Sequence, residues 1–303
     1  HRIIDIDACP IQKGGNNEII PVVRQWMKDY KIPAYNEDKG TGIVRHIMGR
    51  TGVHSGEIMV CIVTAVPMVP HMKELVQMLR KDVPGLTSVI QNINSRHTNV
   101  ILGNKTKVIY GSPTISDSIG DLSFRISAQS FFQVNSEQAQ KLYDTALSYA
   151  DLKGNETVVD VYCGTGTITL FLAKRAKFAY GIEIVEPAIR DAVKNAKDNG
   201  VKNAHFMCGD AAYKLPELLR SGVKPDVIVI DPPRAGCEEK VLNAIASVKP
   251  KRVVYVSCNP ATLARDLAYM KTRGYETQKV QPVDMFPQTH HVETVVLMSR
   301  VDR

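Results

Sequence analysis

Hydrophobic and polar residues follow two different patterns along the chain, and the pattern changes near residue 127. Beyond that point, short β-rich runs such as 157–161 alternate with amphipathic segments of helical period such as 187–199. Strands separated by helical segments of about 10 to 15 residues are joined by right-handed crossovers and form a mostly parallel sheet. The pattern therefore predicts a doubly wound α/β domain over residues 128–303.

The predicted elements of this second domain alternate regularly and end with two strands. The first helix, over 136–149, is introduced by Asn135, which stands three residues before Gln138 in a capping-box-like arrangement. The other helices are predicted over 168–175, 187–199, 211–219, 239–247 and 261–272, and the strands over 157–161, 178–184, 204–208, 226–230, 252–257, 276–283 and 294–298.

The first part of the chain, residues 1–127, reads as short helices mixed with strands. It contains neither internal repeats nor residues at catalytic spacing, and the pattern predicts an α+β domain. Its predicted elements are helices over 18–30 and 71–80, a strand over 59–66, and a hairpin over 98–110 that turns at Gly103-Asn104.

Composition limits the possible classes of protein. The chain has 303 residues, of which 44% are hydrophobic and 23% charged, as is typical of a globular protein with two domains. No stretch approaches the roughly 20 apolar residues that cross a membrane. The formal net charge of +7 is compatible with a polyanionic partner. Because Lys and Arg form no long block, we expect any nucleic acid to bind on a folded surface.

The cysteines and the first residues indicate the setting in which the chain works. The six cysteines are scattered singly, which argues against a disulfide framework or a zinc site and favours a reducing, cytoplasmic location. The chain begins with His1 rather than Met, and residues 1–5 lack the apolar core of a signal peptide. We therefore expect this chain to be a piece of a longer protein.

A glycine-containing turn follows the first strand of the second domain. Gly164 and Gly166 stand where a backbone of positive φ can approach a ligand closely. A dinucleotide-binding turn has a third glycine where this chain has Thr169, which disfavours NAD. Asp160 and Glu183 would repel a pyrophosphate but suit a cationic ligand with a ribose, as S-adenosylmethionine is. A purely structural turn is the alternative.

Acidic residues also follow the third and fourth strands of this domain. Asp210 is placed to reach an adenine amino group, and Asp231 precedes two prolines that hold the backbone open at the sheet edge. Such turns commonly meet the group to be methylated. Enzymes that methylate exocyclic amines typically have an aromatic residue after the prolines, where this chain has Arg234. A proline-braced turn without chemistry is the other alternative.

A cysteine follows the fifth strand of the domain. Cys258 stands just past an apolar run and before a Pro-initiated helix, whose N-terminus is expected to lower the pKa of the thiol. Cys163 and Cys237 are predicted near the same edge of the sheet, so position alone does not choose a nucleophile. A single cysteine is also often a small buried hydrophobic residue.

Four short motifs occur together in the second domain. They are FFQVN at 131–135, DPPRAG at 231–236, SCNP at 257–260 and HHVET at 290–294. In order and spacing, these motifs resemble those of the RNA uracil-5-methyltransferase family. Within that family the chain is most similar to bacterial enzymes that methylate 23S ribosomal RNA, and the choice of RNA as substrate comes from this resemblance.

The resemblance implies a seven-stranded, S-adenosylmethionine-dependent methyltransferase sheet that serves carbon 5 of uridine. Cys258 matches the family nucleophile, which adds to carbon 6 of uracil, and Glu293 matches the general base, which removes the carbon 5 proton. Phe131 and Arg234 match substrate positions, Phe131 as part of the floor of a target-base pocket. Positions that match donor contacts are Gln133, Tyr162, Thr167, Glu183, Asp210 and Asp231.

The resemblance also implies partners. The expected substrate is a uridine in a loop or bulge of 23S ribosomal RNA, and the expected enzyme is a monomer. Transfer RNA as the substrate and a noncatalytic RNA-binding ribosome-assembly factor are the alternatives. Arg45 and His46 are candidates for facing RNA, or equally for a solvated strand face.

Two features of the family are only partly represented in this sequence. Family members usually carry an N-terminal RNA-binding barrel, which we expect to lie outside this chain. Many also hold a four-iron, four-sulfur cluster, and Cys9 is similar to its fourth ligand. Because such a cluster needs four thiolates, we expect no metal in this chain as it stands.

Overall fold

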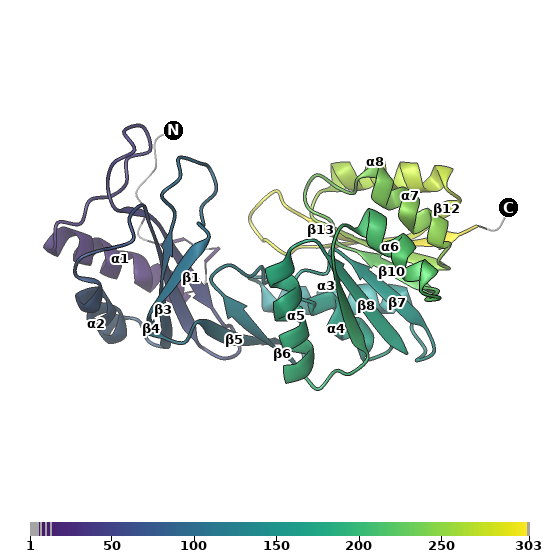
Figure 1. Ribbon diagram of the computed structural model, residues 1–303, viewed down its shortest axis with the longest axis horizontal. Helices are drawn as coiled ribbons and strands as arrows, with labels where there is room; N and C mark the ends of the chain where they lie inside the picture. The colour runs from purple at the N-terminus through teal and green to yellow at the C-terminus, as the bar shows by residue number, and fades with distance from the viewer. Residues whose placement is uncertain (1–5, 7, 10, 13, 302–303) are drawn as a thin grey trace. The chain divides into compact units, whose positions relative to one another are not determined.

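The computed structural model of the protein describes residues 6, 8–9, 11–12 and 14–301 (Figure 1). The expectation that the chain lacks a signal peptide falls on residues 1–5, which lie outside the described residues. Contacts between residues divide the chain into two compact units. The first holds the residues up to Ser118 and 124–130, and the second holds 119–123 and the chain from Phe131 onward. The strand pair β5 (Thr114–Ile119) and β6 (Leu122–Ser127) spans this boundary.

The first unit contains a four-stranded sheet and two helices. Its strands lie in the order β1–β2–β3–β4, and β2 runs parallel to β3 because α2 connects them. Every residue of β2 is buried, and Trp26 of α1 packs in the same core, where its indole N–H donates to the carbonyl oxygen of His71 at 2.7 Å. The elements are α1 (Gly14–Asp29), β1 (Val44–Thr51), β2 (Ile58–Thr64), α2 (Met72–Asp82), β3 (Leu86–Ile93) and β4 (Lys105–Gly111).

The predicted hairpin over 98–110 is wrong in its first strand. β4 pairs with β3 instead, and the residues before β4 form a loop. The side-chain amide of Asn94 donates to the carbonyl oxygen of Val100 at 2.7 Å, and that of Asn92 donates to the carbonyl oxygen of Gly103 at 2.9 Å. Because side-chain amides satisfy the backbone of this loop, it does not need a partner strand.

The side chain of Arg45 is buried and holds a loop of the first unit. The expectations that it faces RNA or solvent are therefore both wrong. The side chain is 1% exposed, and its guanidinium donates to the carbonyl oxygens of Asn94 and Arg96 at 3.0 and 2.6 Å. It also pairs with Glu37 at 3.1 Å and lies 4.6 Å from the centroid of the Tyr35 ring. The alternation of polar and apolar residues along β1 could not show this, because the residues that cover Arg45 come from the segments around Glu37 and around Asn94.

The second unit is a seven-stranded, doubly wound α/β sheet, which confirms the predicted fold class. The strands lie in the order β12–β13–β11–β10–β7–β8–β9. Strands β7 to β11 are mutually parallel, and their right-handed crossovers place α4 and α5 on one face and α6, α7 and α8 on the other (Figure 1). The core between the layers is built from the apolar side chains of these strands.

The helices and strands of this unit begin and end within a few residues of the predicted positions. Asn135 caps α3 as predicted, because its side chain accepts from the backbone N–H of Gln138. The helices are α3 (Ser136–Ala150), α4 (Thr167–Ala173), α5 (Glu186–Asp198), α6 (Ala211–Arg220), α7 (Glu239–Val248) and α8 (Pro260–Thr272). The strands are β7 (Thr157–Val161), β8 (Phe178–Glu183), β9 (Ala204–Cys208), β10 (Val227–Ile230), β11 (Arg252–Ser257), β12 (Tyr275–Val283) and β13 (Glu293–Arg300).

The direction of β13 decides which residues can meet in this unit. β13 runs antiparallel to β11 on one side and to β12 on the other. Its first residue, Glu293, therefore lies at the edge where the parallel strands end, which we call the carboxyl edge of the sheet. This is the edge at which open α/β sheets bind their ligands. Among the described residues, no helix is both long and apolar enough to cross a membrane.

Candidate active site at the carboxyl edge of the sheet

A sharply bent loop connects β7 to α4 at the carboxyl edge. Tyr162, Gly164 and Gly166 all have positive φ, at 69°, 54° and 82°. A Cβ atom on Gly166 would lie 2.9 Å from the ring of Phe206, so a side chain at this position would both strain the backbone and crowd that ring. The loop thus brings its backbone N–H groups to the carboxyl edge in a shape that depends on glycine.

Asp160 is a buried carboxylate next to this loop. Its Oδ2 accepts from the hydroxyl of Thr169 at 2.6 Å, whereas its Oδ1 is buried without a hydrogen-bond partner among the described residues. Burial is the main cause that raises the pKa of Asp160 to about 7. Thr169, which stands where a dinucleotide-binding turn has glycine, therefore serves to hold this carboxylate.

The raised pKa of Asp160 predicts a pH-dependent stability. The folded protein binds the Asp160 proton up to about pH 7, whereas the unfolded chain releases it near pH 4, so this group makes the folded state less stable as pH rises between the two values. Asp160→Asn keeps an acceptor for Thr169 and removes the titration. We expect this variant to gain about 3 kcal/mol over the wild type between pH 5 and pH 8, since about two pKa units of the shift lie in that range. Urea unfolding at both values measures this, and a pH-independent difference would contradict it.

Two further acidic residues stand at the ends of neighbouring strands. Glu183, the last residue of β8, accepts from the backbone N–H of Gly164 at 3.2 Å and from that of Val185 at 2.8 Å. Asp210 caps α6, and its second oxygen pairs with Lys240 at 2.8 Å, which lowers its pKa. Glu183 therefore ties the glycine loop to β8, while Asp210 is already held by a lysine that sequence analysis did not identify.

The structure brings Cys258 and Glu293 together at the carboxyl edge. Ser257, the last residue of β11, lies opposite Thr294 of β13. Cys258 follows Ser257, and Glu293 precedes Thr294, so these two residues come next toward the carboxyl edge. Glu293 is 7% exposed, and burial raises the pKa of its carboxyl while Arg234 opposes the rise. A carboxylate with a raised pKa is a stronger base near neutral pH.

The expected lowering of the Cys258 pKa is wrong. Burial raises the pKa of this thiol, and the carboxylates of Glu293 and Asp231 add to the rise. Arg234 lowers it, but the lowering does not offset the two acids. Sequence analysis considered only the helix N-terminus that follows Cys258 and could not foresee that two acids from other strands approach the sulfur. The thiol is therefore protonated at neutral pH in this structure.

Burial separates the three cysteines predicted near this edge. Cys163 and Cys237 are both buried, and burial raises the pKa of Cys237 to about 12 and that of Cys163 well above its usual range. The backbone N–H of Cys237 donates to the buried carboxylate of Asp266 at 2.8 Å. Cys258 is half-exposed. Of these three sulfur atoms, that of Cys258 is the one that a ligand at the edge can best approach.

The helix that follows Cys258 holds the loop that carries Arg234. The side-chain amide of Asn259 and the hydroxyl of Thr262 both donate to the carbonyl oxygen of Arg234, at 3.1 and 3.3 Å. Arg265, one turn further along α8, donates to the carbonyl oxygen of Ala235 at 2.9 Å. These hydrogen bonds fix the backbone of the loop. They therefore limit the positions that the Arg234 guanidinium can take near Cys258 and Glu293.

Tyr143 of α3 lies among the predicted site residues, although sequence analysis did not identify it. Its phenol is buried, and its pKa is raised first by burial and then by Asp231, Asp160 and Glu293, while a hydrogen bond with Gln133 opposes the rise. In the sequence, Tyr143 is simply one of the apolar positions of a helix. Only the fold shows that this position faces three carboxylates.

Two further predicted residues, Phe131 and Thr167, are more accessible. Phe131 is 72% exposed, whereas its neighbours Phe132 and Gln133 are 9% exposed. Thr167 is the first residue of α4 and is half-buried. The exposed ring of Phe131 is free to stack on a base, and the roles of both residues stay predictions.

The described residues contain no group of three or more His, Cys, Asp or Glu side chains arranged to hold a metal ion. Cys9 is half-buried, and its backbone N–H donates to the side-chain oxygen of Asn17 at 3.1 Å. The residues that the structure describes therefore do not fit an iron–sulfur cluster by themselves. The expectation about a cluster stays untested.

The strand order, the glycine loop and the acidic residues at the strand ends define an S-adenosylmethionine-dependent methyltransferase fold. Residues 54–301 match the family described as tRNA (uracil-5-)-methyltransferase. Since this match covers most of the sequence, the chain belongs to the tRNA (uracil-5-)-methyltransferase family.

Individual relatives agree with this assignment. The chain is 51% identical over 303 residues to an uncharacterized RNA methyltransferase of Clostridium acetobutylicum, and 52% identical over 298 residues to one of Halalkalibacterium halodurans. It covers 66% and 65% of those proteins, and they match 100% and 98% of this chain. The chain thus spans slightly less than two thirds of the length of these relatives.

One solved structure resembles nearly the whole chain. The Pyrococcus abyssi tRNA (uracil-54, C5)-methyltransferase in complex with S-adenosyl-L-homocysteine superposes with a TM-score of 0.82 at 30% sequence identity. The match covers 98% of this chain and 70% of that protein. The likeness therefore extends over both units of the chain.

Proposed function

We propose that the protein transfers a methyl group from S-adenosylmethionine to carbon 5 of a uridine in RNA. The observation that carries this proposal is the meeting of Cys258 and Glu293 at the carboxyl edge, beside Asp231 and Arg234. A thiol and a buried carboxylate in one place are the two groups that this chemistry requires. The sequence relatives and the solved tRNA methyltransferase support it.

The residues at this edge fit the methyl donor. Asp160 has a buried oxygen without a partner, and Glu183 presents a half-buried carboxylate beside the glycine loop, where ribose hydroxyls could donate to it. Burial raises the pKa of Asp160 and of Asp231, and a positive sulfonium bound beside them would favour their ionised forms. We assign donor binding to the set Gln133, Tyr162, Thr167, Glu183, Asp210 and Asp231. When bound, S-adenosylmethionine supplies an electrophilic methyl group.

The catalytic steps follow from the positions of Cys258 and Glu293. After the Cys258 thiol releases its proton to water, its sulfur bonds to carbon 6 of uracil, and the electron pair of the carbon 5–carbon 6 double bond moves toward the carbonyl at carbon 4. The methyl donor, held by the residues assigned above, would supply its methyl carbon to carbon 5 and would leave as S-adenosylhomocysteine. Glu293 removes the carbon 5 proton, the double bond re-forms, and the sulfur of Cys258 leaves carbon 6. Phe131 and Arg234 would hold the extruded base.

The RNA that serves as substrate is the finer part of the proposal. We infer 23S ribosomal RNA from the motifs. Transfer RNA is the second candidate, because the similar Pyrococcus abyssi enzyme is a tRNA (uracil-54, C5)-methyltransferase. We propose that the protein binds either RNA as a monomer in the cytoplasm. The first unit would be a further RNA-contacting domain. His46 is half-buried in that unit.

A methyl-transfer assay with both RNAs tests this proposal. The protein, labelled S-adenosylmethionine and unmodified transcripts of 23S ribosomal RNA and of tRNA are combined, and 5-methyluridine is measured in each. We expect 5-methyluridine in one transcript, and mainly in ribosomal RNA. Methylation of tRNA alone would replace the substrate by the second candidate. Label in neither RNA, although both bind, would favour a noncatalytic RNA-binding factor.

A further inference from the structure

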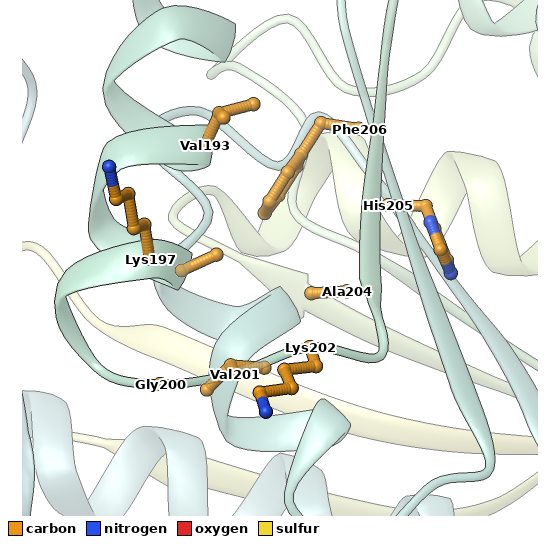
Figure 2. Close-up of a pocket in the computed structure, with 9 residues that line it drawn as sticks. Val193, Lys197, Gly200, Val201, Lys202, Ala204, His205 and Phe206 are labelled. Atoms are coloured by element: carbon orange, nitrogen blue, oxygen red, sulfur yellow. The ribbon is translucent and has the colours of Figure 1, made fainter.

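A hollow lies along the outer edge of the seven-stranded sheet and shares Phe206 with the surroundings of the glycine loop. It is formed between the C-terminal half of α5 and the edge strand β9 and has a volume of about 530 Å³ (Figure 2). We call it the β9 hollow and define it by Val193, Lys197, Val201, Lys202 and Phe206. Figure 2 shows the ring of Phe206 directed toward α5, whereas His205 points to the opposite side of β9.

The β9 hollow combines an apolar wall with unpaired positive charge. Val193 is 53% exposed, and Phe206 is half-buried. Lys194 nearby pairs with Asp191 at 3.7 Å, whereas Lys197 and Lys202 are exposed and form no ion pair within the part of the chain that the structure describes. The two ammonium groups are therefore available to a negatively charged partner.

The other side of β9 presents a row of aromatic rings. His205 stacks on Tyr180 with 5.2 Å between ring centroids and an angle of 29°, and Phe178 lies 6.0 Å from His205. The ammonium of Lys177 lies 5.6 Å from the centroid of the Phe178 ring. We call Phe178, Tyr180 and His205 the aromatic row. Phe178 and His205 are exposed, so further rings can stack on them.

We propose that β9 and its surroundings bind a single-stranded segment of the RNA outside the target nucleotide. Rings and ammonium groups occur on both sides of β9: Lys177 lies beside the aromatic row, and Lys197 and Lys202 line the hollow with Phe206. A single strand that passes over this edge would meet them with its bases and phosphates. A protein strand pairing with the free edge of β9 would use backbone groups and would leave Lys197 and Lys202 without a role. The proposal rests on RNA being the substrate of the proposed function.

The position of the β9 hollow also favours this partner. β9 has five residues, so at about 3.3 Å per residue its first and last Cα atoms are roughly 13 Å apart. The C-terminal end of β9 is followed by Asp210 at the carboxyl edge. The ring of Phe206, in the middle of β9, packs against Gly166 of the glycine loop. An RNA strand of a few nucleotides could therefore reach from the hollow to the donor loop.

The salt dependence of RNA binding tests the proposal. A fluorescent, mixed-sequence single-stranded RNA of 15 nucleotides is titrated with wild type and with Lys197→Gln/Lys202→Gln at several KCl concentrations. If each lysine neutralises one phosphate, the slope of log K against log salt falls in magnitude by about 1.4. The matched control is Lys224→Gln/Lys271→Gln, two exposed lysines elsewhere in the same unit, whose slope should equal that of the wild type.

A second variant tests the aromatic row independently of charge. His205→Ala removes an exposed ring, and we expect the RNA affinity to fall about fivefold or more with an unchanged salt slope. An unchanged slope for the Lys197/Lys202 variant together with unchanged affinity for His205→Ala would overturn the proposal. Methyl transfer by the wild type is measured in parallel. If that transfer is absent while the slope still changes, the proposed function fails and the RNA contact stands.

Discussion

Replacement of Cys258 by alanine is expected to abolish methyl transfer, with a loss of roughly four orders of magnitude or more. Carbon 5 of uracil becomes a nucleophile only after the sulfur adds to carbon 6, so no other step can replace this addition. RNA containing 5-fluorouridine gives a second readout. Fluorine on carbon 5 cannot leave as a proton, so the wild type should form a complex that survives denaturation, and Cys258→Ala should not.

Cys208→Ala is the matched control for this variant, because Cys208 is an exposed cysteine of the same unit. Since Cys208 ends β9, the control is measured at saturating RNA. It should retain both methyl transfer and the stable complex. S-adenosylmethionine binding should persist in Cys258→Ala, which shows that the variant is folded. If Cys258→Ala still forms the stable complex, the nucleophile is another residue.

The pKa of Cys258 adds a pH dependence to the same experiment. The thiol is protonated at neutral pH because burial and two carboxylates raise its pKa. The thiolate fraction therefore increases about tenfold for each pH unit below that pKa, and the rate of complex formation should rise from pH 6.5 to pH 8.5. A rate that is flat over this range would show that the thiol loses its proton by another route.

Replacement of Glu293 by glutamine should stop the reaction one step later. Glutamine keeps the size and hydrogen bonding of the side chain but cannot accept the carbon 5 proton, so the methylated base stays bonded to Cys258. We expect turnover to fall by a factor of about 10² to 10⁴. A covalent protein–RNA complex should accumulate on ordinary RNA, detected as a band of retarded mobility in a denaturing gel.

Glu276→Gln, an exposed substitution on β12, is the matched control and should turn over like the wild type. Normal turnover by Glu293→Gln would remove the base role from this residue. Slow turnover without an accumulated complex would instead place Glu293 before or at the addition step.

The second domain could be predicted from sequence because its strands and helices are encoded locally. β9 and β11 have the predicted bounds, and Asn135 begins α3 through a hydrogen bond to a residue three positions away. The rule that parallel strands gather their carboxyl ends on one side predicts Cys258 at this edge. Glu293 begins the antiparallel strand β13, and its place beside Cys258 is expected from the family resemblance alone. In the first unit, Asn92 and Asn94 hold a loop through side chains, and no periodicity reveals such bonds.

The electrostatics of the site could not be predicted in the same way. The expected lowering of the Cys258 pKa is wrong because Asp231, just after β10, and Glu293, at the start of β13, both lie near Cys258, although they are 27 and 35 positions away in sequence. Tyr143 and the buried Asp266 were missed for a similar reason. Asp266 accepts from Tyr255 at 2.6 Å and from Cys237 at 2.8 Å, and these partners meet only after α8 packs on the sheet.

The identity of the residue that bonds to uracil is the central claim, and peptide mapping tests it most directly. The complex of wild type with 5-fluorouridine RNA is digested with nuclease and trypsin, and the modified peptide is sequenced by mass spectrometry. Cleavage after Arg252 and Arg265 gives the peptide 253–265, in which Cys258 is the sole cysteine. We predict the nucleotide on that sulfur. A nucleotide attached to any other residue, or methyl transfer to ordinary RNA without any attachment, would contradict the proposed mechanism.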